Sequence, residues 1–185
     1  MITVSKPLEC NRHIQDLKKV SQQADRQLSW VVFADDDPVM LRQLREALKK
    51  ESAAIIPTPQ YLWSGGEDTL KDAVLWSIEE LPMTSLVLVG NSAAAVSVSE
   101  PMLSGQITAG EGENEILASV RVAERKRCLA AEHFSQQVQA MINVPEISGS
   151  LMTGSLALHC LFYRAESGVF AFYDPRDGSF RSLIG

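Results

Sequence analysis

Three consecutive aspartates offer the clearest chemistry in this sequence. Asp35, Asp36 and Asp37 directly follow the apolar run 28–34 and precede Pro38. Carboxylates gathered at the end of a buried strand can hold Mg²⁺, which prefers oxygen ligands. An aspartate buried beside another can instead act as a general base, because desolvation and like-charge repulsion raise its pKa. We favour a plainer interpretation over Mg²⁺ binding, in which Asp36 or Asp37 caps the next helix by accepting hydrogen bonds from its unpaired N–H groups.

Other reactive side chains form weaker patterns. The segment 64–67, with the sequence SGGE, could cradle a phosphate at a helix start, but it lacks a lysine and fits a capping box better. His159 and Cys160 are adjacent on an expected strand, so their side chains point to opposite faces and cannot readily share a metal ion. Sequence alone does not bring together the remaining metal-ligand candidates, which are Cys10, His13, Cys128 and His133.

Alternating strands and helices must position these residues. Apolar runs at 28–34, 53–56 and 86–90 predict buried strands. Apolar residues spaced three and four apart predict helices over 38–50 and 70–81. Near-continuous apolar strands that alternate with helices favour a parallel sheet with helices on both faces.

The second half of the chain has a different pattern. The stretch 96–112 is rich in serine and glycine and is interpreted as a loop. A helical period then runs over 113–143, about 45 Å if unbroken, so we expect a bend or two helices. Short alternating stretches over 156–184, with turns at Gly168 and Gly178, predict closing strands.

Composition and charge exclude several classes of protein. The 185 residues are 45% hydrophobic and 22% charged, as in an ordinary globular domain with a full core. The net charge of −6 disfavours a nucleic-acid partner. No apolar run approaches the roughly 18 residues of a membrane span, and residues 1–7 have no signal-peptide core, so no membrane partner is expected. The three cysteines, an odd number, are typical of free thiols in the cytoplasm, which is the expected location.

Two stretches of this sequence resemble the β-carbonic anhydrase family. The segment 68–92 resembles the helix and strand that lead into that family's zinc site, and 156–180 is similar to its closing Leu-X-Leu-His motif and hairpin. Asn11 and Arg12 lie where the family often has Asn-Arg. The resemblance implies an α/β three-layer sandwich with a mostly parallel sheet, helices on both faces and a C-terminal β-hairpin. It also implies a homo-oligomer, a dimer or larger.

The same resemblance indicates that all three zinc ligands are replaced. The family's Cys-X-Asp-X-Arg motif falls on Phe33, Asp35 and Asp37, and its His-X-X-Cys motif falls on Asn91 and Ala94. Phenylalanine and alanine carry no zinc donor, and the neutral carbonyl of asparagine is a poor one. We therefore expect no zinc, no other metal and no cofactor.

A remnant of the family's pocket is expected at the carboxyl ends of the strands, where open α/β sheets bind ligands. A small anion or another small molecule could occupy it, while Phe33 fills part of the space that the metal leaves. The residues expected around this pocket are Asp35, Asp36, Asp37, Asn91 and Ser92.

Three functional hypotheses follow. The first is a zinc-free pseudoenzyme that does not hydrate CO₂ and acts as a binding or regulatory protein. The second is an enzyme of altered chemistry, metal-independent or Mg²⁺-dependent, with Asp35 or Asp37 as the catalytic residue. The third is a phosphoacceptor domain, because the aspartates and the helix 38–50 also resemble a response-regulator receiver, although Asn91 stands where a receiver needs an aspartate.

We expect one domain over 1–185. Its expected parts are a helical arm at 1–27, the remnant active-site half at 28–95, the helical segment 113–143 and the closing strands 156–184.

Overall fold

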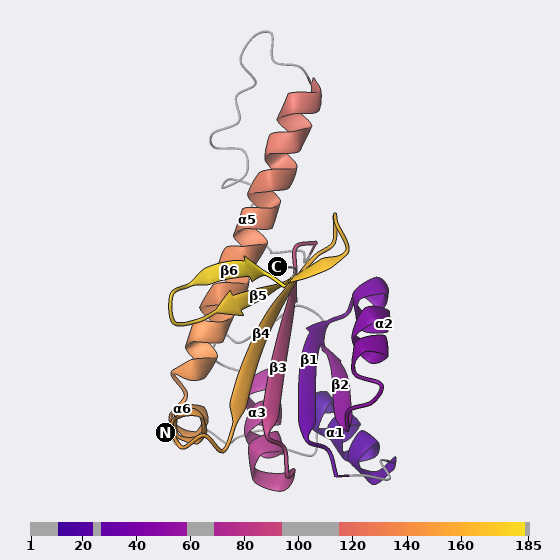
Figure 1. Ribbon diagram of the computed structural model, residues 1–185, viewed down its shortest axis with the longest axis vertical. Helices are drawn as coiled ribbons and strands as arrows, with labels where there is room; N and C mark the ends of the chain where they lie inside the picture. The colour runs from indigo at the N-terminus through magenta and orange to yellow at the C-terminus, as the bar shows by residue number, and fades with distance from the viewer. Residues whose placement is uncertain (1–10, 24–26, 59–68, 94–114, 184–185) are drawn as a thin grey trace.

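One sheet organises the chain in the computed structural model, which describes residues 11–23, 27–58, 69–93 and 115–183. Across these residues the sheet has six strands in the order β2-β1-β3-β4-β5-β6 (Figure 1). The first four are parallel, and β5 and β6 are antiparallel to their neighbours. The strands are β1 (Trp30–Asp35), β2 (Ala53–Thr58), β3 (Ser85–Asn91), β4 (Ala157–Arg164), β5 (Val169–Asp174) and β6 (Ser179–Ser182). The predicted α/β class with a closing hairpin is confirmed.

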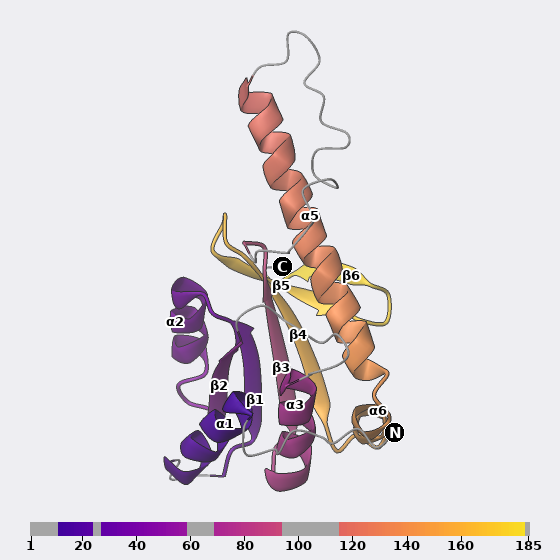
Figure 2. The ribbon, with the colours of Figure 1, turned by 180° about the vertical axis from the view of Figure 1, so that it is seen from behind.

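Helices cover the two faces of the sheet unequally (Figures 1 and 2). Four of the described helices share one large core with the sheet, and α2 alone packs on the other face. The bounds are α1 (Arg12–Gln23), α2 (Pro38–Ala47), α3 (Thr69–Glu80), α5 (Glu115–Ile142) and α6 (Pro145–Met152). No helix among the described residues has the length and apolar character needed to cross a bilayer.

Side chains alternate between the two faces of a strand, so β1 and β3 contribute residues to both hydrophobic cores. Val31 and Phe33 point into the large core, whereas Val32 and Ala34 point toward α2. Every residue of β3 is buried. A parallel strand between two parallel neighbours is apolar on both faces, which is why these strands are continuous apolar runs in the sequence.

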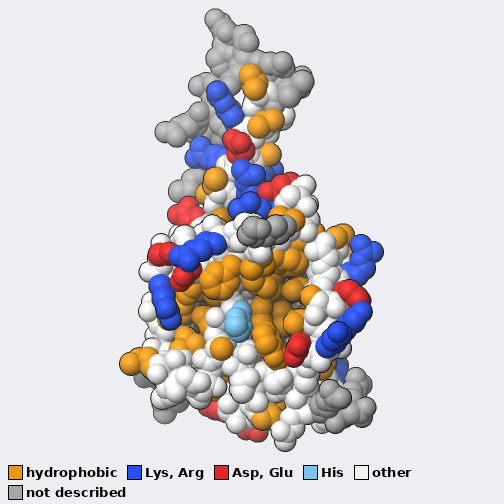
Figure 3. All heavy atoms as spheres, viewed as in Figure 1, with side chains coloured by type: hydrophobic (Ala, Val, Ile, Leu, Met, Phe, Trp, Pro, Cys, Tyr) orange, Lys and Arg blue, Asp and Glu red, His pale blue; other side chains and the backbone are white. Residues whose placement is uncertain are grey.

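Among the described residues, no helix covers β4 and β5 on the face that carries α2, and this part of the sheet is called the bare face below. Figure 3 shows a broad hydrophobic area on this side, with a histidine within it and charged side chains along its rim. Trp30 and His159 stack there, with ring centroids 5.2 Å apart. Leu161 and Phe170 on the same face are only partly buried.

The segment 115–142 forms one helix, α5, rather than the bent or divided helix expected. Its 28 residues span about 42 Å, and its N-terminal half extends beyond the sheet (Figure 1). Leu117 and Val120 in that half are 55% and 48% exposed. Because this half does not wrap around the core, packing gives the helix no reason to curve.

Candidate functional site

The exit of β1 leads straight into the first turn of α2. Asp37 is the N-cap of this helix, in an extended conformation, and Pro38 follows in its first turn. Asp37 Oδ1 accepts a hydrogen bond from the backbone N–H of Met40 at 2.8 Å. The carboxylate satisfies one of the N–H groups that the helix start leaves unpaired. The capping interpretation of the aspartate run is therefore confirmed for Asp37.

Asn91, at the end of β3, binds the same carboxylate. Its Nδ2 donates to Asp37 Oδ2 at 3.3 Å, and its Oδ1 accepts the backbone N–H of Ala93 at 2.9 Å. The Asn91 residue is only 4% exposed. Because both ends of its amide already have partners, Asn91 links the exits of β1 and β3.

Asp35 and Asp36 make shorter-range contacts. Asp35 Oδ1 accepts the backbone N–H of Asp36 at 3.0 Å, and the Asp35 carbonyl accepts the N–H of Asp37 at 2.9 Å. Asp35 is half-buried, and Asp36 is exposed. These contacts hold the tight turn between β1 and α2.

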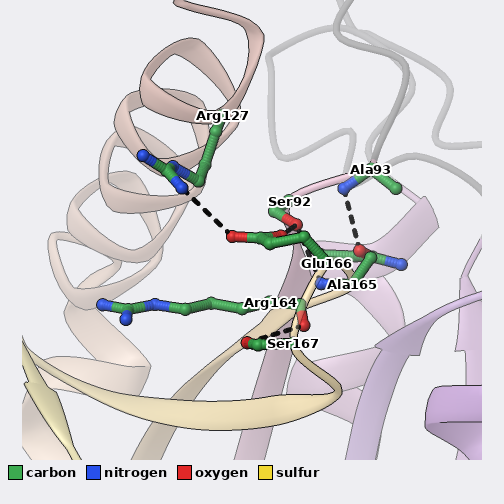
Figure 4. A network of polar contacts seen from close by, with 8 residues as sticks. Ser92, Ala93, Arg127, Arg164, Ala165, Glu166 and Ser167 are labelled. Carbon is green, nitrogen blue, oxygen red and sulfur yellow. Dashed lines mark hydrogen bonds and ion pairs between the residues drawn. The ribbon is translucent and has the colours of Figure 1, made fainter. Parts of the chain in front are cut away.

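Ser92 belongs to a second polar network, shown in Figure 4. Its Oγ donates to Glu166 Oε2 at 2.8 Å and accepts the backbone N–H of Ala165 at 3.0 Å. Arg127 of α5 lies 3.3 Å from Glu166 Oε1. The network joins the exit of β3, the β4–β5 turn and α5.

Hydrogen bonds decide the ionisation of Glu166. Partial burial raises the pKa of this carboxyl, but the bonds from its own backbone N–H, Ser92 and Arg127, together with the charge of Arg127, outweigh it and lower the pKa. Glu166 is therefore an anion that holds its neighbours in place rather than a strong base. Sequence inspection did not connect Arg127, part of a charged run on α5, with Glu166, because the two lie 39 residues apart and share no motif.

Phe33 lies apart from this group. It is fully buried in the large core and pairs with Leu88, whereas Asn91 lies further along β3 and faces α2. The structure thus brings Asp37 and Asn91 together but places Phe33 on the opposite face of the sheet. Ala94 lies outside the described residues.

Aromatic rings fill the space beside Gly90, on the face of β3 opposite Asn91. A Cβ atom added to Gly90 would lie 2.5 Å from Phe134 Cδ2 and 3.0 Å from Phe162 Cδ2. Phe134 also packs against the ring of Tyr173, with centroids 5.9 Å apart. Only glycine fits at this position, since the rings contact its backbone directly.

The metal-ligating residue types stay apart in the described part of the chain. No three His, Cys, Asp or Glu side chains there are placed to hold one metal ion. His159 stacks on Trp30 on the bare face, while Cys160 is buried in the large core, so the expected opposite orientation is confirmed. Burial, and then the charge of Asp174, raise the pKa of the Cys160 thiol to about 12.

Comparison with known proteins adds the identity of the fold. No family model matches the sequence, and no curated protein matches it. Among solved structures, the β-carbonic anhydrase CcaA is 18% identical, with 91% of this chain and 89% of that chain covered and a TM-score of 0.56. A tetrameric β-carbonic anhydrase from Sordaria macrospora is 12% identical, with 84% of each chain covered and a TM-score of 0.57.

The β-carbonic anhydrase CafA of Aspergillus fumigatus gives a similar result. It is 12% identical, with 90% of this chain and 85% of that chain covered and a TM-score of 0.56. The structural similarity establishes the fold. Because the sequence identities are so low, the activity must be argued from the residues themselves. The chain has the fold of the β-carbonic anhydrases.

Proposed function

We propose that this chain is a zinc-free pseudoenzyme with the β-carbonic anhydrase fold, which does not hydrate CO₂ and acts as a binding or regulatory protein. The observation that carries the proposal is the bonding of Asn91. This residue falls where the resemblance puts a ligand histidine, and both ends of its amide are bonded to Asp37 and Ala93. Zinc hydration chemistry needs three protein donors and an open position for water.

The surroundings of Phe33 and Gly90 support the same proposal. Phe33 is fully buried among apolar side chains, and aromatic rings pack directly on Gly90. A buried phenylalanine contributes about 2–3 kcal/mol of apolar stabilisation. This packing lies on the face of the sheet opposite Asp37 and Asn91, and it leaves Phe33, which carries no metal donor, in apolar surroundings.

The alternative enzymatic role of Asp37 receives less support. Its two carboxylate oxygens each accept a hydrogen bond, one from the start of α2 and one from Asn91. Protonation of this carboxylate during a reaction would weaken both the cap of α2 and the bond to Asn91, so its contacts favour a structural role. The receiver-like role is also less favoured, because Asn91 occupies the strand end where the phosphoacceptor aspartate is needed.

We further propose that the protein is a cytoplasmic homo-oligomer without zinc or any other cofactor. The Sordaria macrospora protein of similar fold is described as tetrameric. The bare hydrophobic face around Trp30 and His159 is a surface that a second copy could cover (Figure 3). Light scattering coupled to size-exclusion chromatography would give the assembly's mass.

Metal content and CO₂ hydration test the main proposal together. The protein is purified from zinc-supplemented medium, dialysed and measured by elemental mass spectrometry, and CO₂ hydration is followed by stopped flow. An active β-carbonic anhydrase prepared in the same way is the positive control. We expect far less than one zinc per chain and no hydration above the buffer rate. Near-stoichiometric zinc or hydration at the control's rate would overturn the proposal.

A further inference from the structure

The hairpin of β5 and β6 separates from β4 halfway along that strand. The last paired row is Leu161 with Phe172, yet β4 begins at Ala157 and β5 continues to Asp174. Residues 157–160 therefore pair with β3 on one side and with no described strand on the other. Figure 1 shows β5 and β6 turning away from this half of β4 and crossing α5.

Packing on α5 explains this separation. The ring of Tyr173 is buried against Phe134 of α5 and lies 4.8 Å from the ring of Phe180, measured between centroids. Gln139 Nε2 of α5 donates to the carbonyl of Pro175 at 2.8 Å. These contacts hold the hairpin against the helix and away from the first half of β4.

A groove of about 580 Å³ occupies the gap. Its volume lies within the range of sites that bind small ligands. The groove lies at the amino end of β4, opposite the strand ends that carry Asp37 and Asn91. Its walls mix apolar and polar surface, and its lining residues are Gln139, Ile142, Leu151, Leu156, Ala157, Leu158, Phe172, Asp174, Pro175 and Arg176.

The edge of β4 that pairs with no described strand forms one wall of this groove. The backbone N–H of Ala157 donates to Thr84, and the carbonyl of Tyr163 accepts from Ser92, both toward β3. Because backbone groups alternate along a strand, the N–H and C=O of Leu158 point the other way, into the groove. Such an edge is a template for a further extended chain.

One end of the groove carries charged side chains. Arg181 lies 3.6 Å from Asp174 and also pairs with Asp177, and Asp174 accepts the backbone N–H of Arg176. Within the described residues, the exposed guanidinium of Arg176 has neither an ion-pair nor a hydrogen-bond partner. The rim of the groove thus offers an available cation, which a carboxylate on the ligand would complement.

We propose that this groove binds an extended segment of a partner protein as an added strand along β4. The segment pairs its backbone with Leu158, places apolar side chains against Ile142 and Leu151, and presents an acidic side chain to Arg176. Main-chain pairing supplies affinity, and alternate side chains supply selectivity. The inference names a partner class for the proposed binding role, but it does not depend on the metal content at the other end of the sheet.

Synthetic peptides provide the probe. The set consists of fluorescein-labelled hexapeptides in which valine, isoleucine or phenylalanine alternates with threonine, with one aspartate near an end. Binding to the full chain is measured by fluorescence anisotropy, and the amide signals of Leu158 and Cys160 are followed by NMR. We expect saturable binding by at least one peptide and a shift of the Leu158 amide at the same concentration.

A matched peptide isolates the backbone contribution. N-methylation of alternate peptide nitrogens removes donors without removing side chains, and it is expected to weaken binding at least about tenfold. On the protein, Arg176→Glu is expected to weaken binding by about two- to fivefold, the size of an exposed charge pair. Arg42→Glu, an exposed site on α2, is the control that leaves binding unchanged.

Several outcomes would overturn the proposal. One is that no peptide binds at millimolar concentration, and another is that the N-methylated peptide binds as well as its parent. A peptide that shifts the signals of Trp30 and His159 instead of Leu158 would place it on the bare face. A Leu158 shift that grows with protein concentration alone would assign the groove to a second copy. Near-stoichiometric zinc in the purified protein would overturn the proposed pseudoenzyme role, but it would not change the result of the peptide-binding test.

Discussion

The side-chain amide of Asn91 donates to Asp37 Oδ2, although 54 residues separate the two in sequence. The bond ties the end of β3 to the N-cap of α2, whose other carboxylate oxygen holds the N–H of Met40. One carboxylate therefore stabilises a helix start and satisfies a buried amide. The exits of β1 and β3 are therefore joined by an aspartate and a neutral amide.

Replacing Asp37 by alanine should destabilise the protein by about 2 kcal/mol. Loss of an N-cap costs about 1 kcal/mol, and leaving the buried donor of Asn91 unpaired costs about 1–3 kcal/mol, with partial relaxation. Urea unfolding measures the change in free energy. Asp36→Ala, at the exposed neighbour, should stay within about 0.5 kcal/mol of the unmodified protein. Equal effects of the two substitutions would remove the special role of Asp37.

Two glycine substitutions should change stability in opposite directions. Gly90→Ala places a methyl group 2.5 Å from the ring of Phe134, and overpacking of this kind costs about 1–3 kcal/mol. Gly149→Ala, inside α6, meets nothing within 4 Å and should stabilise by about 0.5–1 kcal/mol, because alanine favours the helix. Thermal and urea unfolding of both variants give the signs. A stabilising Gly90→Ala would show that the rings move aside freely.

The parallel sheet and the capping role of Asp36 or Asp37 could be predicted because they depend on local patterns. Continuous apolar runs separated by amphipathic helices leave few arrangements other than a parallel sheet. An aspartate directly before a proline that opens a helix has a strong capping preference. Whether Phe33 and Asn91 share one site depends instead on where each side chain lies on the sheet. The number of residues between Phe33 and Asn91 does not give the register of β1 against β3. The structure gives it, since Phe33 pairs with Leu88, three residues before Asn91.

Long-range polar contacts and open surfaces could not be predicted. Glu166 meets Arg127 and Ser92 across 39 and 74 residues, and no periodicity connects exposed residues so far apart. The separation of β5 from β4 likewise depends on where Tyr173 packs against Phe134, which is a tertiary contact. The sequence of β4 contains no sign that residues 157–160 pair with no described strand on one side.

The Glu166 network should weaken in acid. The pKa of Glu166 is lowered in the folded state, so its contribution is complete above the ordinary value of 4.5 and is lost as pH falls through the lower folded-state pKa. Since the Glu166 side chain is 45% exposed, solvent screening keeps this contribution below about 1 kcal/mol. Glu166→Gln should therefore lower stability slightly at pH 7 and make no difference in strong acid.

Urea unfolding from pH 7 downward measures this difference for Glu166→Gln. Arg127→Gln removes the same ion pair and should give the same pH profile, whereas Glu80→Gln, at the exposed end of α3, should not. The opposing result is that the free energies of unfolding of Glu166→Gln and the unmodified protein differ by the same amount at every pH. That result would assign the effect of the substitution to packing rather than to charge.

The two described cysteines should differ sharply in reactivity. Cys160 is 1% exposed, and burial, followed by the charge of Asp174, raises its pKa to about 12, whereas Cys128 lies exposed on α5. The thiolate is the nucleophile, so a thiol that is both buried and protonated does not react. Iodoacetamide at pH 8 should label Cys128 in the native protein and Cys160 only after unfolding in urea. Peptide mapping by mass spectrometry separates the two sites from Cys10. Labelling of Cys160 at the rate of Cys128 in the native protein would mean that β4 opens readily, because this thiol is buried in the large core and meets solvent only when the packing around β4 is lost.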